Sequence, residues 1–143
     1  MQAVTVFETQ VNTLSDTCAL AKAVAEGLKG GEVILLNGEL GAGKTTFTKF
    51  LASELGITET VTSPTFITVK EYKSGRIPFV HADMYRRTEK DNEDIAEYLL
   101  FHDACFVLEW NKLNIPAIKK IISIDIEVIS ETERKFTIKK NFI

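Results

Sequence analysis

The sequence predicts an α/β fold with a mixed central sheet, mainly parallel in the middle and antiparallel at one side. Short apolar runs alternate with segments of helical period, which is typical of this class. A glycine-rich loop joins one apolar run to a helix, and the C-terminal part alternates apolar and polar residues with period two. The chain has 143 residues, a length that suits one domain, and neither a repeat nor a linker divides it. We therefore expect a single domain over residues 1–143.

The first elements follow from the spacing of apolar residues. A helix is expected over residues 14–28, starting from a capping box made by Thr13 and Asp16. The run EVILLN, residues 32–37, predicts a strand that is buried on both faces. A second helix is expected over residues 44–55. The apolar faces of the two helices are formed by Cys18, Ala21, Ala25 and Leu28 and by Phe47, Phe50, Leu51 and Leu55.

The middle of the chain predicts two strands, a helix and a further strand. Residues 66–72 and 77–82 indicate strands, with Gly75 in the turn between them. The acidic segment DNEDIAEYLL, residues 91–100, favours a helix. The run ACFVLEW, residues 104–110, predicts another buried strand.

The C-terminal part predicts an antiparallel hairpin. Apolar and polar side chains alternate over residues 122–128, so one face should be buried and the other wetted. The segment ETER, residues 131–134, should turn the chain into a last strand that carries Phe136 and Ile138.

Composition and charge exclude several functions. The chain is 45% hydrophobic and 26% charged, has a net charge of −3 and contains only four arginines. Proteins that grip a nucleic-acid backbone by themselves carry more positive charge, so we expect no DNA binding and contact with RNA only through a partner. No apolar run is long enough for a signal peptide or a transmembrane helix, so we expect no membrane association. Cys18 and Cys105 are isolated, and we expect buried, reduced thiols in a cytoplasmic protein.

The stretch LLNGELGAGKTTF, residues 35–47, predicts a phosphate-binding loop. Gly38, Gly43, Lys44 and Thr45 match the pattern G-x-x-x-x-G-K-[ST] between an apolar strand and a helix. Glycines let backbone N–H groups turn toward an anion, and the helix adds its positive N-terminal end. Lys44 should reach the β- and γ-phosphates of a nucleoside triphosphate, and the Thr45 hydroxyl should bind Mg²⁺. The expected fold is thus a three-layer, P-loop NTPase-like domain. Its expected nucleotide-binding residues are Glu39, Leu40, Gly41, Ala42, Gly43, Lys44, Thr45 and Thr46.

Hydrolysis also requires a carboxylate that steadies the metal or orients water. Glu109 and Asp83 each close a predicted strand, and we favour Glu109 for Mg²⁺, directly or through water. Asp83 is a second candidate. His81 is either a general base or a hydrogen-bonded structural histidine. Thr65 is either a sensor hydroxyl or an ordinary loop residue, and Arg86 is either a charge-stabilising finger or a surface arginine.

Two other nucleotide-dependent classes fit less well. NKLN, residues 111–114, approaches the guanine-reading motif, but Asn114 replaces its essential aspartate, so a GTPase switch is not expected. A small-molecule kinase is the more serious alternative, because many kinases share this loop and this size. Such kinases close an arginine-rich lid over the phosphates, which four arginines can hardly supply.

Four motifs together resemble the TsaE family, the small bacterial ATPases of tRNA threonylcarbamoyladenosine synthesis. They are GELGAGKTTF, SPTF, HADMYR and EW, in this order and spacing. The resemblance implies a weak, Mg²⁺-dependent ATPase that associates with the TsaD–TsaB heterodimer. That heterodimer modifies adenosine 37 of tRNA, and ATP hydrolysis would reset it between turnovers.

The resemblance also implies roles for individual residues. Switch segments next to the nucleotide would include Ser63, Thr65, His81 and Tyr85. The catalytic set would be Lys44, Asp83, Glu109 and Arg86, with Thr45, Glu109 and Asp83 on the metal side. Thr13, Leu14 and Arg134 would lie near the adenine.

Overall fold

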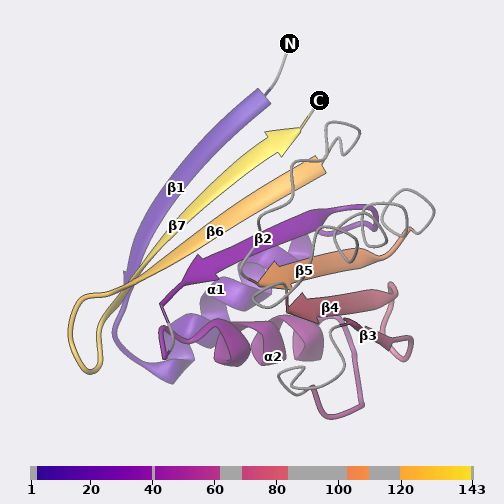
Figure 1. The fold of residues 1–143 in the computed structure, drawn as a ribbon, viewed down its shortest axis with the longest axis horizontal. Helices are drawn as coiled ribbons and strands as arrows, with labels where there is room; N and C mark the ends of the chain where they lie inside the picture. Colours follow the sequence, from indigo (N-terminus) through magenta and orange to yellow (C-terminus); the bar gives the residue numbers. More distant parts are fainter. Residues whose placement is uncertain (1–2, 40, 62–68, 84–102, 110–119, 143) are drawn as a thin grey trace.

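The computed structural model describes residues 3–39, 41–61, 69–83, 103–109 and 120–142. These residues form two helices and one seven-stranded sheet with the order β1-β7-β6-β2-β5-β4-β3 (Figure 1). The elements are β1 Ala3–Val11, α1 Leu14–Glu26, β2 Val33–Gly38, α2 Lys44–Glu54, β3 Val69–Tyr72, β4 Phe79–Asp83, β5 Cys105–Glu109, β6 Lys120–Val128 and β7 Arg134–Phe142.

The sheet is parallel at its centre and antiparallel at both sides. β2 runs parallel to β5 and to β6, and β4 runs parallel to β5. β7 pairs antiparallel with β6 and with β1, and β3 pairs antiparallel with β4. The predicted α/β class, the parallel centre and the C-terminal hairpin are therefore confirmed. The expected acidic helix over residues 91–100 lies outside the described residues.

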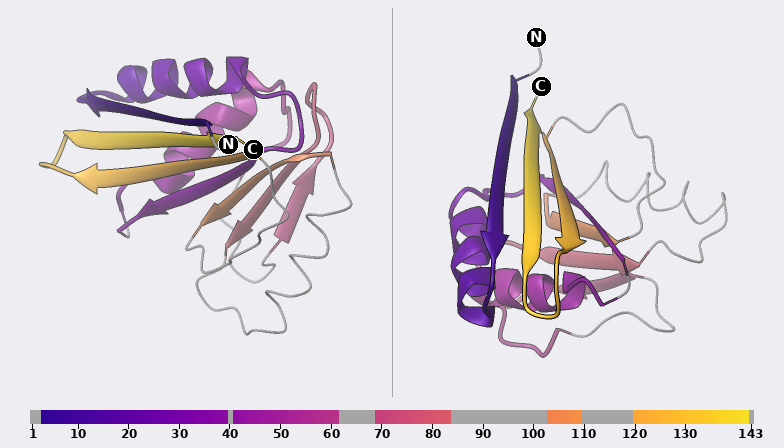
Figure 2. Two further views of the ribbon diagram at one scale, coloured as in Figure 1. Left: turned by 90° about the horizontal axis from the view of Figure 1, so that it is seen from above. Right: turned by 90° about the vertical axis from the view of Figure 1, so that its left-hand side faces the viewer.

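Both described helices cover the same face of the sheet (Figure 2). Alternate side chains of the central strands join α1 and α2 in one large core, which includes Ile34, Leu36 and Phe47. The opposite side chains of the same strands form a second cluster of Val33, Val80, Ala82, Ala104, Phe106 and Leu108. Central strands that are apolar on both faces are what a parallel sheet requires.

The helix boundaries follow from local chemistry. The predicted capping box is present at the start of α1, where the Thr13 hydroxyl accepts from the Asp16 N–H and the Asp16 carboxylate accepts from the Thr13 N–H. The expected end at residue 28 is wrong by two residues, because Gly27 caps the helix. α2 ends at Glu54, one residue earlier than expected. The C-terminal ends of both helices meet the β3–β4 turn, where Arg76 donates to the carbonyl oxygens of Leu28 and Ala25.

The first strand, β1, was not among the predicted elements. It pairs with β7 along nine residues, from Ala3 opposite Phe142 to Val11 opposite Arg134. Val6 and Phe7 are more than half exposed, so β1 lacks the strict alternation that marks a half-buried strand. β1 is instead fixed by its ladder with the hairpin.

Two predictions of burial need correction. Val128 at the end of β6 is exposed rather than buried, because the hairpin there extends beyond the helices. Cys18 is half-buried, whereas Cys105 is buried in the core as expected. Burial raises the pKa of the Cys105 thiol, which keeps it protonated.

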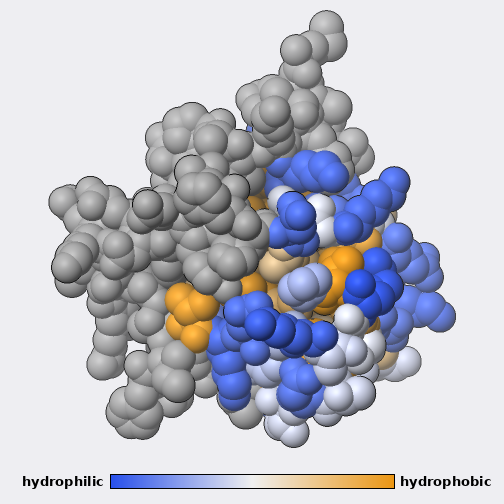
Figure 3. Space-filling view, turned by 90° about the vertical axis from the view of Figure 1, so that its right-hand side faces the viewer, coloured by the Kyte–Doolittle hydropathy of each residue, from blue (hydrophilic) through white to orange (hydrophobic). Residues whose placement is uncertain are grey.

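Among the described residues, the exposed large apolar side chains lie on β1, at the start of α1 and around the β6–β7 turn. The described residues on the face shown in Figure 3 are mainly hydrophilic, with small apolar areas between them. Within the described ranges, no helix has the length and apolar character needed to cross a membrane.

Candidate functional site

The loop between β2 and α2 has the backbone geometry of a phosphate-binding turn. Gly41 and Gly43 have φ values of 80° and 107°, which favour glycine over any other residue. A Cβ on Gly38 would lie 3.0 Å from the Ile126 carbonyl oxygen, so a larger residue here would crowd β6. Gly43 is the N-cap of α2 and supplies no side-chain cap. The N-terminal N–H groups of α2 are therefore available to an anion.

Lys44 is buried at the first position of α2. Its ammonium donates to the carbonyl oxygen of Gly38, at 2.6 Å, and so folds back over the loop. The loop thus places a buried positive charge beside the N-terminus of a helix. Both features favour a bound phosphate group.

Arg134 ties the loop to the β6–β7 turn. Its Nε donates to the Ala42 carbonyl at 3.1 Å, and its Nη2 lies 3.5 Å from the Gly41 carbonyl. Its Nη1 donates to carbonyl oxygens of the turn, including that of Ser130 at 2.8 Å. One guanidinium therefore connects two segments that are about ninety residues apart in sequence.

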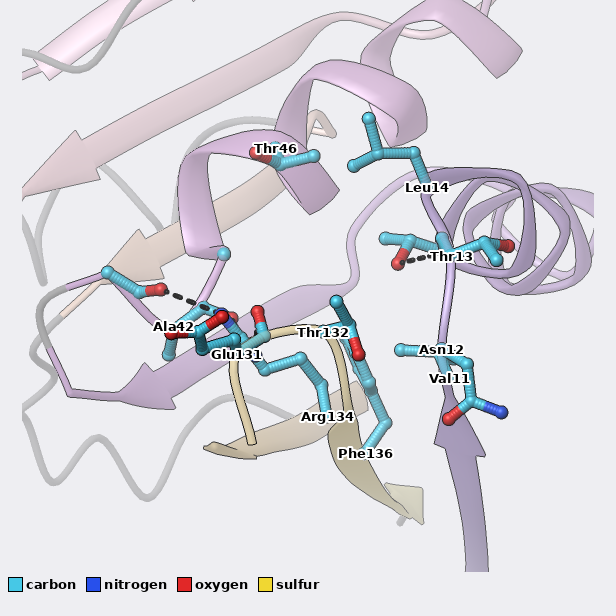
Figure 4. Close-up of a pocket in the computed structure, with 13 residues that line it drawn as sticks. Val11, Asn12, Thr13, Leu14, Ala42, Thr46, Glu131, Thr132, Arg134 and Phe136 are labelled. Carbon is cyan, nitrogen blue, oxygen red and sulfur yellow. Dashed lines mark hydrogen bonds between the residues drawn. The ribbon is translucent and has the colours of Figure 1, made fainter. Parts of the chain in front are cut away.

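A cavity of about 320 Å³ lies beside the loop (Figure 4). Three segments line it, namely residues 11–14 with 17, residues 41–43 with 46, and residues 131, 132, 134 and 136. Thr13, Leu14 and Arg134, which were predicted near an adenine, all line this cavity. Sequence reasoning missed Asn12, Glu131 and Thr132, because only the pairing of β1 with β7 brings the two segments together.

The carboxyl ends of the parallel strands bring the predicted carboxylates to the same edge as the loop. In the strand register, Glu109 on β5 stands opposite Leu36 on β2 and opposite Asp83 on β4. The loop leaves β2 at Gly38, two residues beyond Leu36. Cys105 and Val107 face the core beneath the helices, and Glu109 continues this series on the same face of the sheet.

Glu109 is buried, and its partner is His81. The Nε2 atom of His81 lies 2.5 Å from Oε2 of Glu109, and both side chains are almost fully buried. The Nδ1 atom of His81 is buried and has no hydrogen-bond partner among the described residues. Of the two interpretations of His81, the hydrogen-bonded residue matches this geometry.

The oxygen groups at the site suit a hard cation that also binds oxygens of a ligand. Thr45 lies in the first turn of α2, and Glu109 lies at the end of the neighbouring strand. Mg²⁺ prefers oxygen ligands and usually takes only one or two carboxylates, with water and phosphate oxygens completing its shell. Among the described residues, no group of three or more His, Cys, Asp or Glu side chains could hold a metal by itself.

Some predicted site residues lie outside the described residues. They are Leu40, Ser63, Thr65, Tyr85 and Arg86. For Asp83, only the backbone position is described. Glu39, Thr45 and Thr46 lie on the loop and the first turn of α2, and their roles stay predictions.

The strand, the glycine loop with its lysine and the helix define an α/β protein whose strand-to-helix loop has the pattern of a phosphate-binding loop. The comparisons with known proteins narrow this class. A family described as "Threonylcarbamoyl adenosine biosynthesis protein TsaE" matches residues 11–136. The chain belongs to the TsaE family, whose members act in the biosynthesis of threonylcarbamoyladenosine in tRNA.

Individual relatives agree with this assignment. A protein of Bacillus subtilis (strain 168), named tRNA threonylcarbamoyladenosine biosynthesis protein TsaE, is 49% identical over 100 residues, which cover 68% of this chain and 62% of the relative. The protein of the same name from Aquifex aeolicus (strain VF5) is 41% identical over 126 residues, covering 86% of this chain and 88% of the relative. The crystal structure of Bacillus subtilis YdiB has a TM-score of 0.78 at 35% identity, covering 96% of this chain and 87% of YdiB.

Proposed function

We propose that this chain is a Mg²⁺-dependent ATP-binding protein with weak ATPase activity. We further propose that it is an accessory subunit of the complex that forms threonylcarbamoyladenosine at position 37 of tRNA. Membership of the TsaE family supports the pathway. The observation that carries the nucleotide part is the buried Lys44, whose ammonium folds over a glycine loop at the start of α2.

The loop and the adjoining cavity together suit a nucleotide. The triphosphate would bind the N–H groups of residues 41–46, with Lys44 neutralising its charge. The base and ribose would then enter the cavity between the β1–α1 junction and the β6–β7 turn. Its volume of about 320 Å³ falls within the range of small-molecule sites.

Thr45 and Glu109 would hold Mg²⁺, with Asp83 as the second candidate. When bound, the metal supplies charge neutralisation at the phosphates and so stabilises the transferred phosphoryl group. Glu109, which is held at the end of β5, would itself bind the metal or orient a water molecule. Lys44 would hold the β- and γ-phosphates in line for attack.

The partner would be the TsaD–TsaB heterodimer, in the cytoplasm. ATP hydrolysis would reset that heterodimer between turnovers, and tRNA would be contacted only through it. A net charge of −3 supports an indirect role with tRNA, because direct phosphate contacts require a basic surface.

A phosphate-release assay tests this proposal. The purified chain with γ-³²P-labelled ATP and Mg²⁺ should release inorganic phosphate slowly, and the rate should rise when TsaD–TsaB is added. The Lys44→Ala chain is the control for contaminating ATPases. The small-molecule kinase remains the alternative, and label on a nucleoside or a sugar alcohol in place of inorganic phosphate would favour it.

A further inference from the structure

The pair of His81 and Glu109 is the most buried ionisable contact among the described residues. His81 has no exposed surface, and Glu109 is 4% exposed. A buried carboxylate is costly unless it accepts hydrogen bonds, and the imidazole Nε2 supplies one at 2.5 Å. The contact joins the middle of β4 to the end of β5, because His81 pairs with Val107, two residues before Glu109.

The geometry separates His81 from direct chemistry. Its Nε2 is occupied by Glu109, and its Nδ1 is buried without a partner in the described part of the chain, so neither ring nitrogen reaches solvent or the described part of the loop. A general base must come within hydrogen-bond reach of the proton that it accepts. His81 can instead fix the rotamer of Glu109, because its Nε2, on the neighbouring strand β4, holds the Oε2 atom of the carboxylate.

We propose that His81 is a positioning residue: it orients the Glu109 carboxylate and thereby sets the affinity of the nucleotide-bound chain for Mg²⁺. This inference rests on the proposed function, which makes Glu109 the metal-side carboxylate. Hydrogen-bond partners of ligating carboxylates commonly change metal affinity by about 10–100-fold when they are removed.

The test compares two amides that differ by one methylene. In His81→Gln, the side-chain amide can place its N–H close to the original Nε2 position, whereas the shorter side chain of His81→Asn cannot reach it. Affinity for Mn²⁺, used as a paramagnetic probe for Mg²⁺, is measured by electron paramagnetic resonance on the ADP-bound chain. Affinity for fluorescent ADP in excess EDTA is measured in parallel, which also reports whether each variant is folded.

The expected result is metal affinity close to wild type for His81→Gln and about 10–100-fold weaker for His81→Asn. Metal-free ADP affinity should be the same for all three chains. In a Glu109→Gln background, the His81→Asn substitution should have no further effect on metal affinity, because the two residues act through one contact.

Two outcomes would contradict the proposal, and they are distinguishable from failure of the proposed function. Equal Mn²⁺ affinity of the Asn variant and the wild type would show that His81 does not position the ligand. A full additional loss in the Glu109→Gln background would show that His81 acts elsewhere. If the wild-type chain bound no ADP at all, the proposed function itself would fall.

Discussion

The cavity beside the loop and the region at the carboxyl ends of β4 and β5 are built in opposite ways. The cavity is lined by three separate segments, namely a glycine turn, a helix start and a hairpin tip, and Arg134 joins the turn to the hairpin. The region at these strand ends is closed and depends on two buried side chains, His81 and Glu109. The loop would bind the nucleotide through backbone N–H groups together with the Lys44 ammonium, whereas the metal side depends on single carboxylates and their partners. Substitutions should therefore separate binding from turnover.

The largest expected effect is the loss of nucleotide binding in Lys44→Ala. Removing the ammonium takes away charged hydrogen bonds to the phosphates, each worth about 1.5–3 kcal/mol, so ATP affinity should fall by about 100-fold or more. Isothermal titration calorimetry with Mg-ATP measures this change. Lys49 is exposed on the same helix, and Lys49→Ala is the matched control, with affinity expected close to wild type. Equal losses in both variants would mean that general charge, rather than the loop, holds the phosphates.

Glu109→Ala should keep nucleotide binding and lose hydrolysis, whereas Lys44→Ala loses binding itself. ATP binding should be largely kept, because the loop makes most of the contacts, while phosphate release should fall by about 100-fold or more. Single-turnover hydrolysis and calorimetry on the same preparation measure the two quantities. Normal hydrolysis by the Glu109→Ala chain would move the metal assignment to Asp83, its register neighbour on β4.

These two regions also differ in how far the sequence predicts them. The loop is local: Gly38, Gly43, Lys44 and Thr45 lie within eight residues, so spacing alone indicates the chemistry. The contact between His81 and Glu109 joins residues 28 apart and depends on the register of β4 against β5. Sequence reasoning placed Glu109 at the end of a strand and His81 within one, yet it left the role of His81 open.

The fold shows the same contrast. β2, α2 and the hairpin were predicted because each carries its own periodicity, whereas β1 was missed because long-range pairing fixes it. The clamp by Arg134 is also non-local, because its guanidinium reaches from the hairpin to the carbonyl oxygen of Ala42 in the loop before α2. What remained unpredicted is therefore what tertiary pairing decides.

A smaller effect is expected from loosening the clamp in Arg134→Ala. The loop carbonyls of Gly41 and Ala42 would lose their link to the hairpin, at a cost of about 1–2 kcal/mol. Nucleotide affinity should fall by about 10-fold, and the thermal unfolding temperature should also fall. Lys135 is the neighbouring control, because its contact with Glu8 is an exposed ion pair that contributes little. A drop in thermal stability with unchanged affinity would show that the clamp supports the hairpin and not the site.

The smallest expected effect lies at the rim of the cavity, where Asp16 caps α1. Backbone hydrogen bonding from Asn12 lowers the pKa of the Asp16 carboxyl, although the group is fully exposed. A lowered folded-state pKa means that the ionised group stabilises the fold above its ordinary pKa, and that this contribution is lost as the pH falls through the lower folded value. Urea unfolding measures the free energy of unfolding between about pH 5 and pH 2. This free energy should fall slightly more with decreasing pH in the wild type than in Asp16→Asn. ADP affinity at neutral pH should be the same for both chains, because this cap orders the helix start without touching the loop. Weaker ADP binding by Asp16→Asn would show that the nucleotide site depends on the Asp16 carboxylate as well as on its capping partner Thr13, which lines the cavity.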